Sequence, residues 1–113
     1  MMKKIEAIVR TTKLEPLKEA FLKANLTGMT VSEVHGCGNQ HGWKEFYRGS
    51  EVIINMLPKI KIEMIVADDK VQAVVDLIIE TAKTGQVGDG KIFVIPVEDV
   101  IRIRTGEKGA VAI

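Results

Sequence analysis

The segment 71–82 restricts the fold more than any other part of the sequence, because its apolar residues repeat with a helical period. They recur at intervals of three and four positions: Val71, Val74, Val75, Ile78, Ile79 and Ala82. This spacing places all six on one stripe of an amphipathic helix, and we expect Asp68 or Asp69 to cap its start. Alternating apolar and polar residues at 60–66 predict a strand before the helix, and the run 92–95 predicts a strand after it. The region is therefore a β-α-β unit.

The first third of the chain repeats this order. Alternation over residues 5–9 predicts a strand, and Thr12 and Glu15 have the spacing of a capping box for a helix that ends near Asn25. Residues 29–35 then predict a second strand. The full order, β-α-β, a long loop and β-α-β, is typical of an α+β, ferredoxin-like split βαβ domain.

Two helices on one face of such a sheet leave its other face uncovered. Because the predicted strands carry apolar residues on both sides, we expect this face to pack against further copies of the chain in a homo-oligomer.

Composition limits the class of protein. The 113 residues suffice for one domain, 1–113, and the formal net charge of +1 with 4% aromatic residues argues against a nucleic-acid partner. A single cysteine indicates a reducing compartment. No apolar run reaches membrane-spanning length, and the N-terminus lacks the apolar core of a signal peptide, so we expect a cytoplasmic protein.

A glycine-rich segment separates the second helix from the strand 92–95. We expect Pro96 to end this strand. Gly85, Gly88 and Gly90 give the backbone freedom to form a concave site for an anion, and Lys91 adds a positive charge. The order is not that of a Walker A motif, which connects a strand to a helix. The alternative is that Gly85 only terminates the helix and that a tight turn follows. The residues alone leave both interpretations open.

The segment 37–57 is the least core-like part of the chain, and long loops of this kind are often functional. Residues 52–57 could extend a neighbouring strand, which would make part of the segment a projecting hairpin. His35, Cys37 and His41 raise the alternative of a metal site, but structural zinc usually needs four ligands. Trp43 is either an interface anchor or packed against its own loop.

Together these segments resemble one family, the P-II nitrogen-regulatory signalling proteins. The resemblance runs in order along nearly the whole chain. It is carried by Thr27-Gly28-Met29-Thr30-Val31, Gly36-x-Gly38-x-Gln40, Tyr47-Arg48-Gly49, Leu57-Pro58-Lys59-x-Lys61-Ile62-Glu63, Thr84-Gly85 through Val94, and Arg102-Ile103-Arg104-Thr105-Gly106-Glu107.

The resemblance implies a homotrimer with ATP or ADP in each of three clefts between subunits. It implies a phosphate-holding B-loop at about 83–91 and two arginines in the C-terminal segment 102–113 that reach the phosphates from the adjoining subunit. Alternation predicts that these two guanidiniums share one face, although a solvated strand edge is the alternative. The implied nucleotide site comprises Gly28, Met29, Thr30, Gly36, Cys37, Gly38, Asn39, Gln40, Glu63, Gly88, Asp89, Gly90, Lys91, Arg102 and Arg104.

The resemblance also identifies 37–57 as the T-loop, the arm that reaches target proteins. It implies that Gln40 contacts both 2-oxoglutarate and the magnesium ion that accompanies ATP, and that Lys59 faces a carboxylate of the keto-acid. Trp43, Tyr47 and Arg48 are the expected partner-binding residues.

Three positions of the arm depart from patterns common in the family, and a fourth matches a modified residue of some relatives. Asn39 stands where many members have arginine, which leaves the preference between ATP and ADP open. Cys37 replaces a commonly aromatic residue. Val52 occupies the place of the uridylylated tyrosine, which argues against that modification, and Ser50 matches a serine phosphorylated in cyanobacterial relatives.

These expectations describe a regulator rather than an enzyme, since the sequence offers no nucleophile paired with a base. The expected target is a transporter, of the ammonium or another type, or an enzyme of nitrogen metabolism. A transporter would bring this cytoplasmic protein to the membrane. The alternatives are an adenylate-charge sensor without a 2-oxoglutarate response that controls a non-ammonium transporter, and a slow ATPase.

Overall fold

The computed structural model describes the backbone of residues 1–36, 43–47, 50–54 and 56–113, and the side chains of residues 1–36 and 56–113. A short 3-10 helix precedes each α-helix, at Thr11–Lys13 and Asp68–Lys70, and another lies at Gly109–Ala112. The main elements are β1 (Met2–Val9), α1 (Leu14–Lys23), β2 (Thr30–Gly36), β3 (Trp43–Tyr47), β4 (Ser50–Ile54), β5 (Leu57–Ala67), α2 (Val71–Ala82) and β6 (Lys91–Val97).

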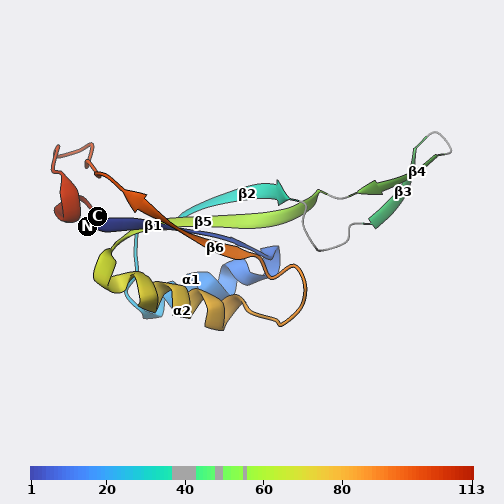
Figure 1. Cartoon of the computed structure of the whole chain (residues 1–113), viewed down its shortest axis with the longest axis horizontal. Coiled ribbons are helices and arrows are strands. Elements are labelled where there is room, and N and C mark those ends of the chain that lie inside the picture. The colour runs from blue at the N-terminus through green and yellow to red at the C-terminus, as the bar shows by residue number, and fades with distance from the viewer. Residues whose placement is uncertain (37–42, 48–49, 55) are drawn as a thin grey trace.

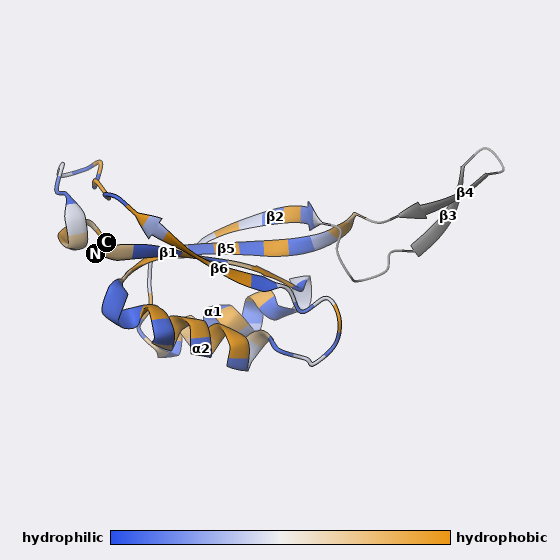
Figure 2. Ribbon diagram, viewed as in Figure 1, coloured by the Kyte–Doolittle hydropathy of each residue, from blue (hydrophilic) through white to orange (hydrophobic). Residues whose placement is uncertain are grey.

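Four strands form an antiparallel sheet in the order β2-β5-β1-β6, and both α-helices cover the same face of it (Figure 1). This is the predicted ferredoxin-like β-α-β-β-α-β arrangement. Apolar side chains of the sheet and helices meet in a single core, and the helices turn their apolar stripes toward the sheet (Figure 2). The largest fully buried side chains are Phe21, Ile5, Leu17, Ile62, Ile78 and Val74.

The predicted helix caps are wrong. Each α-helix follows a 3-10 turn, so the residues at the N-cap positions are Lys13 and Lys70, neither of which makes a side-chain capping bond. Asp68 instead accepts a hydrogen bond from the Lys3 ammonium at 2.9 Å. This hydrogen bond lowers the pKa of the Asp68 carboxyl. The Asp68 side chain therefore connects β1 to the end of β5 and does not cap α2.

Strand β6 extends beyond Pro96 to Val97, against the prediction that Pro96 ends it. Because β6 is an edge strand, the missing N–H of a proline can face away from the sheet without disrupting a ladder. Beyond it, Ile101 makes only an isolated bridge with Lys108. The predicted strand alternation around residues 101–104 is therefore absent from this part of the described chain.

The uncovered face of the sheet is charged at its centre rather than apolar, which corrects the sequence-based argument. Lys4 and Lys61 alternate there with Glu6 and Glu63 at distances of 2.8 to 3.6 Å between charged atoms. The Lys4 hydrogen bond to Glu63 lowers the pKa of that carboxyl and raises the pKa of the lysine. Large apolar side chains are exposed instead along β6. Phe93 and Ile95 pair with Glu6 and Lys4 on this face, and Val94, which pairs with Ile5, is exposed on the other face.

The long segment contains the expected hairpin. β3 and β4 pair antiparallel, with Trp43 opposite Ile54, and the hairpin extends away from the end of the main sheet (Figure 1). β4 does not extend β5, because the two strands belong to separate sheets.

Among the described residues, neither α-helix has the length and apolar character of a membrane span.

Candidate functional site

The glycine turn, residues 84–90, connects α2 to β6. Gly85, Gly88 and Gly90 have φ values of 86°, 102° and 97°, in the left-handed region that glycine adopts without strain. Helix α2 ends at Ala82, and its C-cap Lys83 is already extended. Gly85 is therefore part of the turn and not the residue that terminates the helix, and a tight turn follows it at residues 87–88.

Gly90 brings the turn into direct contact with the sheet. A Cβ atom added at Gly90 would lie 1.7 Å from the carbonyl oxygen of Ile8, so no side chain fits there. The next residue, Lys91, pairs with Ile8 as the first residue of β6. Its side chain is exposed, and its ammonium makes no hydrogen bond or ion pair with any described residue.

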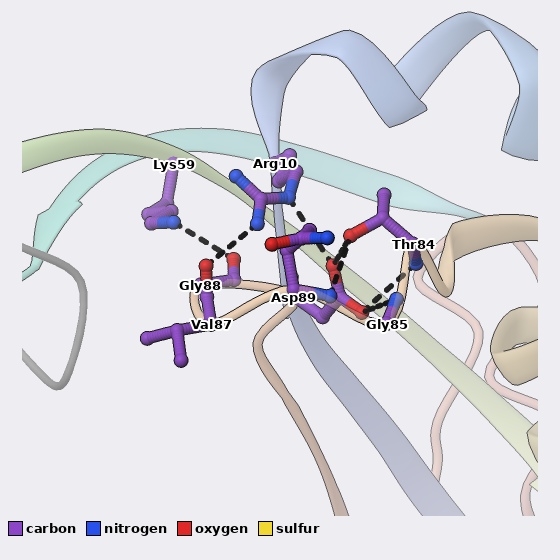
Figure 3. Close-up of polar contacts among 8 residues, drawn as sticks. Arg10, Lys59, Thr84, Gly85, Val87, Gly88 and Asp89 are labelled. Atoms are coloured by element: carbon purple, nitrogen blue, oxygen red, sulfur yellow. Dashed lines mark hydrogen bonds and ion pairs between the residues drawn. The ribbon is translucent and has the colours of Figure 1, made fainter.

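Two cationic side chains, Arg10 and Lys59, lie beside the turn, and the carboxylate of Asp89 lies within it, as Figure 3 shows. Arg10 donates from Nη2 to the carbonyl oxygen of Val87 at 2.7 Å, and Lys59 donates from Nζ to that of Gly88 at 3.0 Å. The Asp89 carboxylate turns back into the loop and pairs with the Arg10 guanidinium at 3.2 Å. The expected phosphate loop and the expected keto-acid lysine are therefore in contact.

Arg10 is the site residue that sequence reasoning missed. It follows the last residue of β1, and Val9 pairs with Ile60 of β5, so the strand register brings Arg10 beside Lys59. Strand pairs were not assigned from the sequence. Pairing the predicted strands 5–9 and 60–66 as antiparallel neighbours would have brought the residue after the first strand to the start of the second.

Positive charge exceeds negative charge around the turn. Arg10, Lys59 and Lys91 carry three positive charges against the single carboxylate of Asp89. Partial burial, and secondly repulsion from Arg10, lower the pKa of Lys59. An anion placed here would offset both costs.

A cavity of about 400 Å³ lies between α2 and β6, with the end of the turn as one wall. Its lining is mainly apolar, with the polar groups of Lys83, Asp89 and Lys91 along the turn. The turn is therefore bordered by open space, through which a group of another molecule can approach it.

Three further residues of the implied nucleotide site, Met29, Thr30 and Glu63, lie elsewhere on the sheet. Thr30 pairs with Glu63 across β2 and β5, and Met29 packs against the core beside them. β2 and β6 are opposite edges of the sheet, so Thr30 is separated from Lys91 by roughly 14 Å across three strand spacings. The carboxylate of Glu63 is held by Lys4 and Lys61.

Arg102 and Arg104 do not alternate along a strand, contrary to the sequence-based argument. They begin the arginine turn, residues 102–107, which is closed by a bond from Gly106 N to Arg102 O at 2.7 Å. The Arg102 guanidinium donates to Glu107 at 2.9 Å and to the carbonyl oxygen of Val111 at 2.8 Å, whereas the Arg104 side chain has no such partner among the described residues.

The arginine turn also lies far from the glycine turn of the same chain. β6 leads from the glycine turn at Lys91 to Val97, a length of roughly 20 Å, before the chain reaches Arg102. Figure 1 shows the C-terminal segment beside the N-terminus, at the end of the sheet opposite to the glycine turn. One chain therefore does not bring the two turns together.

Several predicted residues fall outside the described part of the chain: Cys37, Gly38, Asn39, Gln40, His41 and Arg48. Trp43 and Tyr47 are described only by the backbone of β3. Gly36 ends β2 opposite Leu57, where the arm begins, and Gly28 has a φ of 79°. The described residues contain no group of three His, Cys, Asp or Glu side chains that could hold a metal ion.

Comparison with known proteins decides the family. The family model of Nitrogen regulatory protein P-II matches residues 2–107. The chain belongs to the P-II family. Nitrogen regulatory protein P-II of Nostoc punctiforme is 56% identical over 112 residues, covering 99% of this chain and 100% of that protein. Nitrogen regulatory protein P-II 1 of Escherichia coli K12 is 55% identical with the same coverage.

A solved P-II structure shows the same fold. The crystal structure of Arabidopsis thaliana PII bound to citrate superimposes with a TM-score of 0.80 at 43% identity, covering 98% of this chain and 91% of that one. The sequence-based assignment to the P-II family is therefore confirmed, and the relatives are named as regulatory proteins.

Proposed function

We propose that this P-II family member is a homotrimeric signal transducer that binds ATP or ADP between its subunits and regulates a target protein through its arm. The nucleotide phosphates contact the glycine turn through Gly88, Gly90 and Lys91. Magnesium accompanies ATP and is bound by Gln40, and the keto-acid 2-oxoglutarate binds beside it, facing Lys59. The protein acts in the cytoplasm, where it regulates a transporter or an enzyme of nitrogen metabolism.

The glycine turn carries this proposal. It combines three left-handed glycines, a contact with β1 too close for any side chain, and an exposed lysine at its end. Such a turn presents backbone N–H groups at close range to an anion, and the lysine supplies a compensating charge. The local excess of positive charge favours a polyanion such as a nucleotide diphosphate or triphosphate.

The positions of the two arginines support a site shared between subunits. Arg102 and Arg104 lie at the end of the sheet opposite to their own glycine turn, so they can reach phosphates only on a neighbouring chain. The exposed apolar side chains of β6 support assembly along this edge, since exposed Phe93, Val94 and Ile95 would lose their contact with water.

The surroundings of Lys59 support a carboxylate ligand. The ammonium lies between the glycine turn and the foot of the arm, next to Arg10. The similar Arabidopsis protein was solved with citrate, a small polycarboxylate. A dicarboxylate at Lys59 would contact both the glycine turn, where the nucleotide binds, and the arm. Its binding would therefore couple the conformation of the arm to the nucleotide that occupies the turn.

The arm supports the regulatory role. The hairpin of β3 and β4 extends from the sheet, where it can enter or pair with another protein. Trp43, Tyr47 and Arg48 belong to this arm and are the proposed partner-binding residues. We propose regulation rather than catalysis because the relatives are named as regulatory proteins.

Calorimetric titration tests this function. The purified protein is titrated with ADP and then with Mg-ATP, each with and without 2-oxoglutarate, and its mass is measured by light scattering. We expect a mass of three 12.5 kDa chains, nucleotide binding, and tighter 2-oxoglutarate binding in the presence of Mg-ATP.

The Lys91→Ala variant should lose at least about tenfold in nucleotide affinity, because a charge-assisted contact to phosphate is removed. Lys23→Ala, which removes another exposed ammonium at the end of α1, is the matched control and should bind as the parent does. Equal affinity of the Lys91→Ala variant would contradict the phosphate site. Nucleotide binding without any 2-oxoglutarate effect would limit the protein to sensing adenylate charge.

A further inference from the structure

Asp89 lies inside the glycine turn and uses both of its carboxylate oxygens there (Figure 3). Oδ2 accepts hydrogen bonds from the backbone N–H groups of Thr84 and Gly85 at 2.8 and 2.9 Å. Oδ1 accepts from the Thr84 hydroxyl and from Arg10 Nε, the latter at 3.2 Å. The carboxylate thus connects the start of the turn to its end and connects both to β1.

These donors keep Asp89 ionised. The hydrogen bonds from Thr84, first from its hydroxyl and then from its backbone N–H, hold the pKa of the carboxyl well below its ordinary value. The contacts therefore persist from neutral pH down through the range in which an ordinary aspartate takes up a proton. Loss of this arrangement requires a mutation rather than a physiological change of pH.

The two cations beside the turn hold its carbonyl groups. Arg10 donates a hydrogen bond to the carbonyl oxygen of Val87, and Lys59 donates one to the carbonyl oxygen of Gly88. These peptide bonds are trans, and in a trans peptide the C=O and the following N–H point in opposite directions. The N–H groups of Gly88 and Asp89 therefore point away from the two cations, and they leave the turn on the same side.

We propose that Arg10 and Asp89 are positioning residues that clasp the glycine turn in the one conformation that presents its peptide N–H groups to a phosphate. The inference rests on the proposed nucleotide function. It adds Arg10 to the site, and it gives Asp89, which the resemblance placed among the nucleotide-binding residues, a role in positioning the turn without touching the ligand. Asp89 fixes the start of the turn, Arg10 fixes both Asp89 and the Val87 carbonyl, and the close contact of Gly90 with Ile8 fixes the end.

The sign of one substitution separates this role from two simpler ones. If Asp89 were only a negative charge near the phosphates, removing that charge would strengthen nucleotide binding. If Asp89 were a magnesium ligand, its loss would weaken Mg-ATP binding but leave ADP without magnesium unaffected. A positioning role predicts that removing the Asp89 charge weakens nucleotide binding. It also predicts that ADP binding without magnesium is weakened, because the conformation of the turn itself is disturbed.

The experiment measures ADP affinity without magnesium for Asp89→Asn, Arg10→Lys and the double variant. We expect Asp89→Asn to weaken ADP binding about ten- to a hundredfold, because the amide cannot replace the ion pair and turns an NH₂ group toward a donor. Arg10→Lys keeps the charge but cannot contact Asp89 and Val87 together, so we expect a loss of about tenfold. The double variant should lose little more than Asp89→Asn alone, since both changes open the same clasp.

Asp68→Asn is the matched control, because it removes a carboxylate paired with Lys3 at the other end of the sheet. Amide NMR spectra of the nucleotide-free proteins provide a second measurement. The signals of Gly85, Gly88 and Gly90 should move in both clasp variants and stay in place in the control. Thermal unfolding shows whether each variant is folded, and if Asp89→Asn does not fold, Arg10→Lys is judged by the same criteria.

Unchanged or tighter ADP binding by a folded Asp89→Asn protein, with the parent protein binding ADP, would overturn the clasp and leave the proposed function intact. Weaker binding with unmoved glycine signals would also overturn it. Failure of the parent protein itself to bind ADP would instead overturn the proposed function and the inference that rests on it.

Discussion

The glycine turn and the arginine turn were both expected to hold phosphates, yet the structure supports them in different ways. The glycine turn is attached to the sheet by Arg10, by Lys59 and by the contact of Gly90 with Ile8. The arginine turn is attached mainly to its own C-terminal segment, through the bonds of Arg102 to Glu107 and Val111. The glycine turn is thus held against the sheet, whereas the arginine turn bonds mainly to residues that follow it in the chain.

This difference indicates separate roles in one site. A turn fixed to the core can present backbone donors in a set geometry before any ligand arrives, which reduces the ordering cost of binding. A turn that projects from the end of the sheet, with Ile103 fully exposed, can instead meet another chain. The comparison predicts that changes at the glycine turn act on geometry and that changes at the arginine turn act mainly on charge.

Gly90→Ala should have the largest effect. Its Cβ would overlap the Ile8 carbonyl, and its φ of 97° is strained for alanine, so the turn must leave the sheet. We expect a cost of roughly 3 kcal/mol and a loss of about a hundredfold in ADP affinity. Chemical denaturation and calorimetry measure the two quantities.

Gly85→Ala is the control for this prediction. Gly85 has a similar φ of 86°, but a Cβ there would meet nothing within 4 Å. It should therefore cost only about 1 kcal/mol for the backbone strain. Equal effects of the two substitutions would show that the contact with β1 is unimportant and would remove the main distinction between the two turns.

Arg104→Ala and Arg102→Ala come next. Each should weaken ADP binding about ten- to a hundredfold, because each removes a charge-assisted contact to phosphate. Only Arg102→Ala should also increase hydrogen exchange in the segment 107–112, since that side chain bonds to Glu107 and Val111. Full affinity in the Arg104→Ala variant would restrict the phosphate contacts to the glycine turn.

The pH dependence of 2-oxoglutarate binding is the smallest expected effect. Because burial and then Arg10 lower the pKa of Lys59, the ammonium loses its proton at a lower pH than the ordinary lysine value of 10.5. Affinity should therefore fall with rising pH before 10.5 is reached, with less than about a twofold change near neutrality. Calorimetry over an alkaline pH series measures this fall.

Lys59→Arg provides the control, since a guanidinium keeps its charge throughout this range. The Lys59→Arg variant should bind 2-oxoglutarate with little dependence on pH. Its affinity should be lower, because a guanidinium does not have the geometry of the lysine ammonium. The same pH profile for the arginine variant and the parent would mean that another group controls the titration.

Much of the fold followed from local patterns. The apolar repeat of 71–82 and the alternation of 5–9 and 60–66 predicted α2, β1 and β5, because hydrophobic spacing directly reflects which face of an element is buried. The caps were wrong because 3-10 turns displaced the N-cap positions by one or two residues. Pro96 was misjudged because its acceptability depends on β6 being an edge strand, which is a property of the sheet.

The sequence by itself determined the family, the order of elements and the glycine turn, since these depend on residue type and spacing along the chain. Only the tertiary structure revealed that Arg10, Lys59 and Asp89 meet, that Arg102 and Arg104 lie at the far end, and that the open face is charged at its centre. Arg10 and Asp89 are 79 positions apart. The contact between them arises from antiparallel strand pairing and from the close packing of Gly90 on β1, so no local pattern contains it.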